Sequence, residues 1–184
     1  MGISYPPIRP LSFQKAMVFI DGTNLFHRLD ESNLNLQANL AQILKTCVGG
    51  RQIVRMYLYT IRAYLDRAKT LHGSRISQEI RLIFGEGIPT ESGQIREKGV
   101  DALLVADLVY HAAVRNFDYA LVVSTDTDFV QALHRVEDFG CRTGVLAVCT
   151  EVPERLAQAC DESQTLPKDS LLRNNWAAVR PSSD

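Results

Sequence analysis

Four aspartates have positions that could support metal chemistry: Asp21, Asp101, Asp126 and Asp128. Each follows an apolar segment of the sequence or lies at the start of a segment with a helical pattern. Several carboxylates in one crevice repel each other unless they are protonated or bound to a cation. All-oxygen ligands favour Mg²⁺ or Mn²⁺ over zinc. Such an ion can activate water against a phosphodiester and stabilise the leaving oxygen. The four aspartates therefore predict a divalent-metal site that cleaves phosphodiesters.

Each aspartate also has a structural interpretation. Asp21-Gly22 fits a turn, Asp126 or Asp128 fits a helix N-cap, and Asp101 fits a first-turn acid stabilised by the helix dipole. Taken singly, each structural interpretation is the better one. Taken together, polar ends on two buried strands and an acid at a third junction favour a functional site.

The elements that must position these acids are short apolar strands alternating with helices. Five segments are expected as strands: 16–20, 53–59, 81–84, 119–123 and 142–148. The first and fourth are continuously apolar, which is typical of strands buried on both faces. This pattern predicts an α/β fold of three layers with a central, mostly parallel five-stranded sheet. In the order 3-2-1-4-5, the first and fourth strands are neighbours, so that Asp21 and Asp126 converge at the carboxyl edge.

Helices are expected at 36–48, 63–72, 100–114, 129–139 and 153–160, with a further helical turn or two at 74–80. The polar segment 88–97 is expected as a loop facing the substrate. Prolines in residues 1–15 indicate an extended arm, residues 16–163 form the domain, and residues 164–184 form a polar tail with the only tryptophan, Trp176.

Two other phosphate chemistries are disfavoured. The string VFIDGT is similar to the opening of haloacid-dehalogenase-like phosphatases, but Phe19 stands where they need a nucleophilic aspartate. The glycines at 85 and 87 lack the rest of a dinucleotide fingerprint, and no lysine-serine or lysine-threonine ending of a phosphate-binding loop is present.

Three motifs resemble those of NYN domains, in particular the LabA-like branch of the PIN-like nuclease superfamily. They are FIDGTNLF, REKGVDALLVADLV and ALVVSTDTDFVQAL, in that order along residues 16–150. The resemblance implies the 3-2-1-4-5 sheet, dependence on Mg²⁺ or Mn²⁺, and endoribonuclease activity. It also implies that the acids of the site are Asp21, Asp101, Asp126 and Asp128.

The same resemblance extends to residues that would bind substrate: Asn24, Lys98, Ser124 and Thr125. Asn24 would hold a phosphate or a scaffold contact, and Lys98 would offset charge on the phosphate. Thr125 departs from the family pattern, which often has glycine there. Asp107 matches a frequent acid of the family, but it lies about 120° around the helix from Asp101 and is expected to be structural or to act indirectly.

Composition restricts the partners and the compartment. The 20 basic and 21 acidic residues give a net charge of −1, so nucleic-acid binding requires a local patch. Residues 51–81 hold seven basic and two acidic side chains, which fits either such a patch or a solvated helical face. The four cysteines match neither a zinc nor a disulfide pattern and are expected to be reduced. No apolar run is long enough to span a membrane, so a cytoplasmic location is expected.

The sequence thus predicts an endoribonuclease with a preference for single-stranded RNA. The alternative is a non-catalytic module that binds RNA or protein on the same scaffold. Exposed apolar residues in the tail would favour a homodimer.

Overall fold

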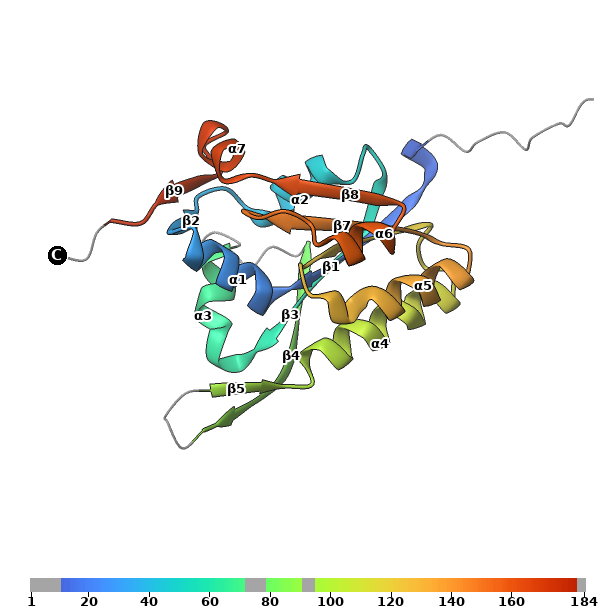
Figure 1. Cartoon of the computed structure of the whole chain (residues 1–184), viewed down its shortest axis with the longest axis horizontal. Coiled ribbons are helices and arrows are strands. Elements are labelled where there is room, and N and C mark those ends of the chain that lie inside the picture. The colour runs from blue at the N-terminus through green and yellow to red at the C-terminus, as the bar shows by residue number, and fades with distance from the viewer. Residues whose placement is uncertain (1–10, 72–78, 91–94, 182–184) are drawn as a thin grey trace, which may run out of the picture.

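A seven-stranded sheet runs through the centre of the protein (Figure 1). The computed structural model describes residues 11–71, 79–90 and 95–181. The order of the sheet is β5-β4-β3-β1-β6-β7-β8. Neighbouring strands are parallel except β4 and β5, which are antiparallel. The strands are β1 (Lys15–Asp21), β3 (Gln52–Ile61), β4 (Ile80–Pro89), β5 (Ile95–Lys98), β6 (Tyr119–Val123), β7 (Arg142–Val148) and β8 (Glu162–Leu166).

Helices cover both faces of this sheet. The α-helices are α1 (Gly22–Glu31), α2 (Leu40–Cys47), α3 (Leu65–Leu71), α4 (Val100–Ala113), α5 (Val130–Asp138), α6 (Glu154–Gln158) and α7 (Lys168–Arg173). The 3-10 turns are η1 (Leu11–Phe13), η2 (Arg62–Tyr64) and η3 (Thr127–Phe129). The first three α-helices and α7 contribute to one hydrophobic core, and α4, α5 and α6 contribute to the other.

The central strand explains why the apolar runs are continuous. In β1, Ala16, Val18 and Ile20 join the core under α1 and α2, while Met17 and Phe19 join the core under α4 and α5. Successive side chains of a strand point to opposite faces, so a strand covered on both sides is apolar at every position. The three-layer α/β fold and the mostly parallel sheet are confirmed.

The expected five-strand sheet is corrected to seven strands. The five expected segments lie in the middle in the order β4-β3-β1-β6-β7, and β5 and β8 add one strand at each edge. The expected loop 88–97 is wrong at both ends, because β4 continues to Pro89 and pairs with β5. Edge strands are paired on one side and partly exposed, so they lack the apolar pattern of the inner strands.

The segment from residue 164 packs against the domain. The expected boundary after residue 163 falls inside β8. Beyond α7, β9 (Ala177–Val179) pairs antiparallel with β2 (Leu34–Leu36). The expected helix 36–48 is therefore shorter: α2 begins at Leu40, and Asn39 caps it by accepting a hydrogen bond from the Ala41 backbone N–H.

Among the other expected helices, α4, α5 and α6 lie within their predicted ranges. The helix at 63–72 appears as η2 and α3, and most of the turn expected at 74–80 lies outside the described residues. The four cysteines are free thiols, of which Cys47 and Cys141 are buried. No helix in the described part of the chain is long and apolar enough to cross a membrane.

Candidate active site

The site lies where β1 and β6 end side by side. These strands are parallel neighbours with Ile20 opposite Val123, so the residues after them meet at the same edge of the sheet. Asp21 is the last residue of β1 and the N-cap of α1, where its carboxylate accepts a hydrogen bond of 3.0 Å from the Asn24 backbone N–H. Ser124 Oγ donates a second hydrogen bond of 2.9 Å to the same carboxylate. Asp21 is thus held by both elements.

Asp21 carries a charge that the fold disfavours. Only 4% of the residue is exposed. Burial raises the pKa of Asp21 to about 6, against the lowering effect of its hydrogen bonds from Asn24 and Ser124. The neighbouring charges of Asp101 and Asp126 raise it further. A helix cap that only stabilised α1 would not need two further acids beside it.

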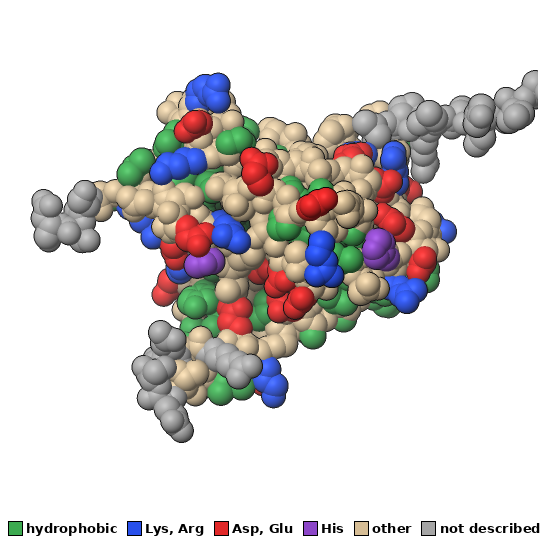
Figure 2. Space-filling view, in the orientation of Figure 1, with side chains coloured by type: hydrophobic (Ala, Val, Ile, Leu, Met, Phe, Trp, Pro, Cys, Tyr) green, Lys and Arg blue, Asp and Glu red, His purple; other side chains and the backbone are tan. Residues whose placement is uncertain are grey.

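The other three predicted acids lie around Asp21. Asp126 caps η3 by accepting a hydrogen bond of 2.9 Å from the Asp128 backbone N–H. Asp101 lies in the first turn of α4, and its pKa is raised by partial burial and then by the charges of Asp126 and Asp128. Figure 2 shows acidic side chains gathered near the centre of this face, between α1 and the start of α5. The structure therefore brings the four predicted carboxylates together.

A fifth acid, Glu97, belongs to this group and was not predicted. Thr23 Oγ1, at the start of α1, lies 2.6 Å from both carboxylate oxygens of Glu97. Burial and then the charge of Asp101 raise the pKa of Glu97. Its only signal in the sequence is its place one residue before Lys98, at the end of the expected loop 88–97.

Two of the predicted substrate-binding residues instead connect α1 to the end of β6. Asn24 Nδ2 donates a hydrogen bond of 3.1 Å to Thr125 Oγ1, and the Thr125 backbone N–H donates one of 3.2 Å to Asn24 Oδ1. Arg28, which was not singled out in the sequence, donates to the same hydroxyl from Nη2 at 3.1 Å. Asn24 therefore makes the scaffold contact that was one of its two predicted roles. The Thr125 hydroxyl, in place of a glycine, is used within the protein.

Ser124 also bonds internally. Its hydroxyl donates to Asp21 and accepts a hydrogen bond of 3.0 Å from the Asp126 backbone N–H. The residue is 2% exposed, so it orients the two aspartates rather than facing solvent. Lys98, in contrast, is exposed at the end of β5.

Asp107 lies on a different face of α4 from Asp101, as the spacing of six residues predicts. Its carboxylate accepts a hydrogen bond of 2.9 Å from the Tyr59 hydroxyl. Burial and then the charge of Asp107 raise the pKa of Tyr59, so this phenol stays protonated and donates. Asp107 therefore fixes α4 against β3 and has a structural contact of its own.

The donor set suits a hard cation. The acids supply only oxygen ligands, and Asp21 and Asp101 each have a pKa raised in part by neighbouring carboxylates, which a cation would relieve. Within the described ranges, no three His, Cys, Asp or Glu side chains are already arranged to hold an ion. Mg²⁺ commonly uses one or two carboxylates and keeps several waters, so the residues fit such an ion without a closed cage.

Comparisons with known proteins agree with this architecture. A crystal structure of a protein of unknown function from Vibrio parahaemolyticus is similar, with a TM-score of 0.65 and 16% sequence identity. The match covers 88% of this chain and 98% of that chain, and at this identity it shows the fold alone. No curated protein matches. The family model described as the NYN domain matches residues 15–167.

Proposed function

Because this chain belongs to the NYN domain family, a family made up generally of PIN-like nucleases, we propose that it is a metal-dependent endoribonuclease. The single observation that carries the proposal is Asp21, a buried carboxylate with a pKa of about 6 that faces further acids. Burying a charge among like charges is unfavourable, and such perturbed groups concentrate at functional sites. Within the family, the motifs around Asp21, Asp101 and Asp126 support the LabA-like branch.

Asp21, Asp101 and Asp126 would hold the Mg²⁺ or Mn²⁺ ion. A divalent ion held there would lower the pKa of water, so that hydroxide becomes available near neutral pH to attack the phosphodiester, and would neutralise charge on the leaving oxygen. Asp21 is mostly ionised at neutral pH, since its pKa is about 6 without a bound cation, and a cation beside it would favour the ionised form further. Both hydrogen bonds that fix its carboxylate come from groups that do not titrate near neutral pH.

The remaining polar residues act on position and charge. Asp128 is exposed at the rim and could orient water. The Lys98 ammonium would offset the charge that develops on the phosphate. Asn24 and Ser124 keep the ends of β1 and β6 in register with each other, since each bonds across the two elements. We propose single-stranded RNA as the substrate and the cytoplasm as its location.

The activity is tested by incubating labelled single-stranded RNA with Mg²⁺ or Mn²⁺. We expect wild-type protein to cleave internally, and Asp21→Asn and Asp126→Asn to reduce the rate by about 100-fold, on the order of losing a transition-state contact. Asp138→Asn is the matched control, because Asp138 is an exposed acid on α5 that pairs with Arg135. Equal cleavage by all four proteins would assign the activity to a contaminant.

A second candidate is a non-catalytic RNA- or protein-binding module. It is motivated by the net charge of −1 and by the limited basic patch over residues 51–81. RNA binding that survives EDTA and falls with salt, with no product in any divalent ion, would support this module over the nuclease.

A further inference from the structure

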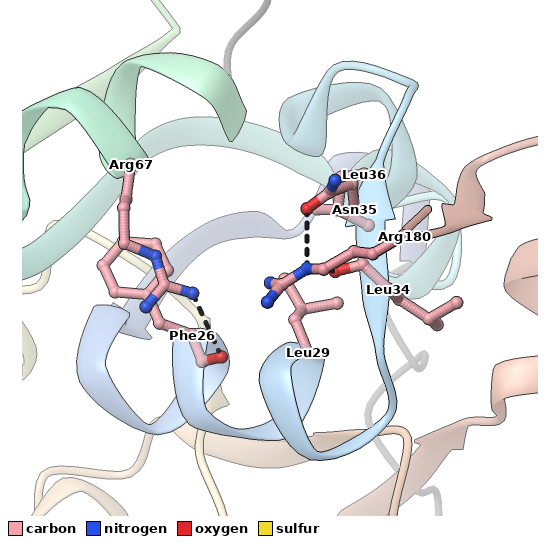
Figure 3. Close-up of a pocket in the computed structure, with 7 residues that line it drawn as sticks. All are labelled: Phe26, Leu29, Leu34, Asn35, Leu36, Arg67 and Arg180. Atoms are coloured by element: carbon pink, nitrogen blue, oxygen red, sulfur yellow. Dashed lines mark hydrogen bonds between the residues drawn. The ribbon is translucent and has the colours of Figure 1, made fainter. Parts of the chain in front are cut away.

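A groove runs along α1 from the acidic centre to a cavity that the activity leaves unexplained. Its first part, of about 190 Å³, is lined by Thr23, Phe26, His27, Asp30, Tyr64 and Arg67. Its second part is the cavity of about 250 Å³ drawn in Figure 3. Phe26 and Arg67 line both parts, so the two adjoin at this pair.

The groove begins at the candidate active site. Thr23, at its near end, bonds Glu97 beside Asp101. Phe26 and Leu29 lie five and eight residues beyond Asp21, which is about 8 and 12 Å along the helix axis at 1.5 Å per residue. A polymer with a phosphate at the acidic centre could therefore lay its next units in the groove.

The side chains of the groove match a nucleic-acid base. The Arg67 guanidinium lies over the Phe26 ring, 4.8 Å from its centroid, and Tyr64 meets that ring edge-on at 5.9 Å (Figure 3 shows the arginine). Phe26 is only 3% exposed and supports the arginine from below, while the Arg67 side chain is 39% exposed. Arginine planes are among the surfaces on which proteins stack unpaired bases. Leu29 and Leu34 supply the apolar walls. A cavity just below the usual ~300 Å³ minimum of small-molecule pockets suits one such base.

The charge of the groove suits a phosphate. Asp30 bonds both Arg67 and Arg180, with 2.6 Å between Arg67 Nη2 and Asp30 Oδ1. Burial alone would raise the pKa of Asp30, but the two arginines outweigh it and hold this pKa below its ordinary value. Asp30 thus stays ionised and neutralises one of two guanidinium charges. The Arg180 side chain is 32% exposed in this pair, so it stays accessible to a phosphate.

Arg180 reaches this place from the far end of the chain. Its Nε donates to Asn35 Oδ1 at 2.9 Å and to the Leu34 carbonyl at 3.1 Å, which fixes the guanidinium over α1 (Figure 3). The pairing of β9 with β2 holds the backbone beside it. Because these contacts already order the Arg180 side chain, it loses little conformational entropy when it binds a phosphate.

We propose that the groove between α1 and α3 binds single-stranded RNA next to the cleaved phosphate, with a base on the exposed side of the Arg67 guanidinium and a phosphate at Arg180. The proposal rests on the proposed function for the direction of the strand, but binding in the groove does not require cleavage. The cavity beside Arg62 and Glu86 is a weaker candidate, because its two charges cancel and its remaining lining lacks an aromatic ring.

The test measures binding of a fluorescent ten-nucleotide single-stranded RNA in EDTA at several salt concentrations. We expect Arg67→Gln and Arg180→Gln each to raise Kd by about fivefold to tenfold, on the order of one stacking or phosphate contact. Arg135→Gln, which removes an exposed, paired arginine from α5, should stay within twofold of wild type. Arg180→Gln should also reduce the slope of log Kd against log salt concentration by about 1, which corresponds to the loss of one phosphate contact.

Two further measurements show whether weaker RNA binding comes from lost base stacking, from lost charge or from a disturbed structure. Arg67→Lys keeps the charge but removes the plane, so it should bind as weakly as Arg67→Gln. Since either glutamine variant removes one partner of Asp30, wild-type protein is also crosslinked to RNA containing 4-thiouridine, and the crosslinks should fall on peptides with Phe26 or Tyr64. Wild-type affinity in Arg67→Lys, crosslinks elsewhere, or no binding by wild type would each overturn the proposal.

Failure of the groove and failure of the activity give different results. If RNA is cleaved but both groove variants bind as wild type does, the groove assignment is wrong and the nuclease stands. If binding depends on the groove but no divalent ion yields product, the nuclease is wrong and the groove stands.

Discussion

The charge of Asp21 destabilises the folded protein when no cation is bound. The pKa of this carboxyl is about 6 in the fold and 3.8 in the unfolded chain, a difference of about 2 units. At 1.36 kcal/mol per unit, the ionised form costs about 3 kcal/mol of unfolding free energy. The folded state binds the extra proton, so this cost is fully present above pH 6 and is relieved as the pH falls toward 4.

Asp21→Asn should therefore stabilise the metal-free protein at high pH. The asparagine oxygen can still cap α1, since asparagine and aspartate are similar N-caps. Its amide must donate to Ser124 Oγ where the carboxylate accepted, at a cost of about 1 kcal/mol for the rearranged hydrogen bond. We expect a gain of about 2 kcal/mol at pH 8 and almost none at pH 4.5, where wild-type Asp21 is already protonated.

The measurement is urea unfolding of both proteins in EDTA at the two pH values. Subtracting the variant from wild type removes the contributions of Glu97 and Asp101, whose pKa values are also raised. Asp138→Asn, which removes an exposed acid, should leave the pH dependence of wild type unchanged. A variant that is less stable than wild type at pH 8, or a stability gap independent of pH, would refute a buried, strained charge at Asp21.

Three other perturbations follow from the same geometry. Mn²⁺ should raise the Tm of wild type in differential scanning fluorimetry, and Asp126→Asn should remove most of this rise; an equal rise in both would place the ion elsewhere. Thr125→Val should lower the unfolding free energy by about 1–3 kcal/mol, because Asn24 and Arg28 both lose the Thr125 hydroxyl as an acceptor, and unchanged urea unfolding would contradict this. Gly22→Ala should destabilise by more than about 2 kcal/mol in the same assay, since its Cβ would lie 2.6 Å from the Tyr59 carbonyl oxygen; wild-type stability would show that α1 can shift.

The inner strands and the acids at their ends could be found from the sequence, because both depend on local patterns. A strand buried on two faces must be apolar throughout, as β1 and β6 are, and polar residues can only follow where it ends. The edges could not be found in this way. β5 and β8 are exposed on one side, so pairing with a neighbour, rather than composition, makes them strands.

Within the site, the sequence determined which residues carry charge and where along the chain they lie. It did not determine their partners. Glu97 joins the acids only because β5 folds back on β4 and meets Thr23, and Asn24 bonds Thr125 because β1 and β6 are adjacent.

The groove along α1 could not be predicted from the sequence at all. Phe26, Arg67 and Arg180 come from α1, α3 and the C-terminal segment, and no spacing in the sequence relates them. Their contact depends on the packing of α3 on α1 and the pairing of β9 with β2, which bury separate apolar surfaces. A local pattern can therefore predict an element and the charge at its end, but only tertiary packing decides which distant side chains share a binding surface.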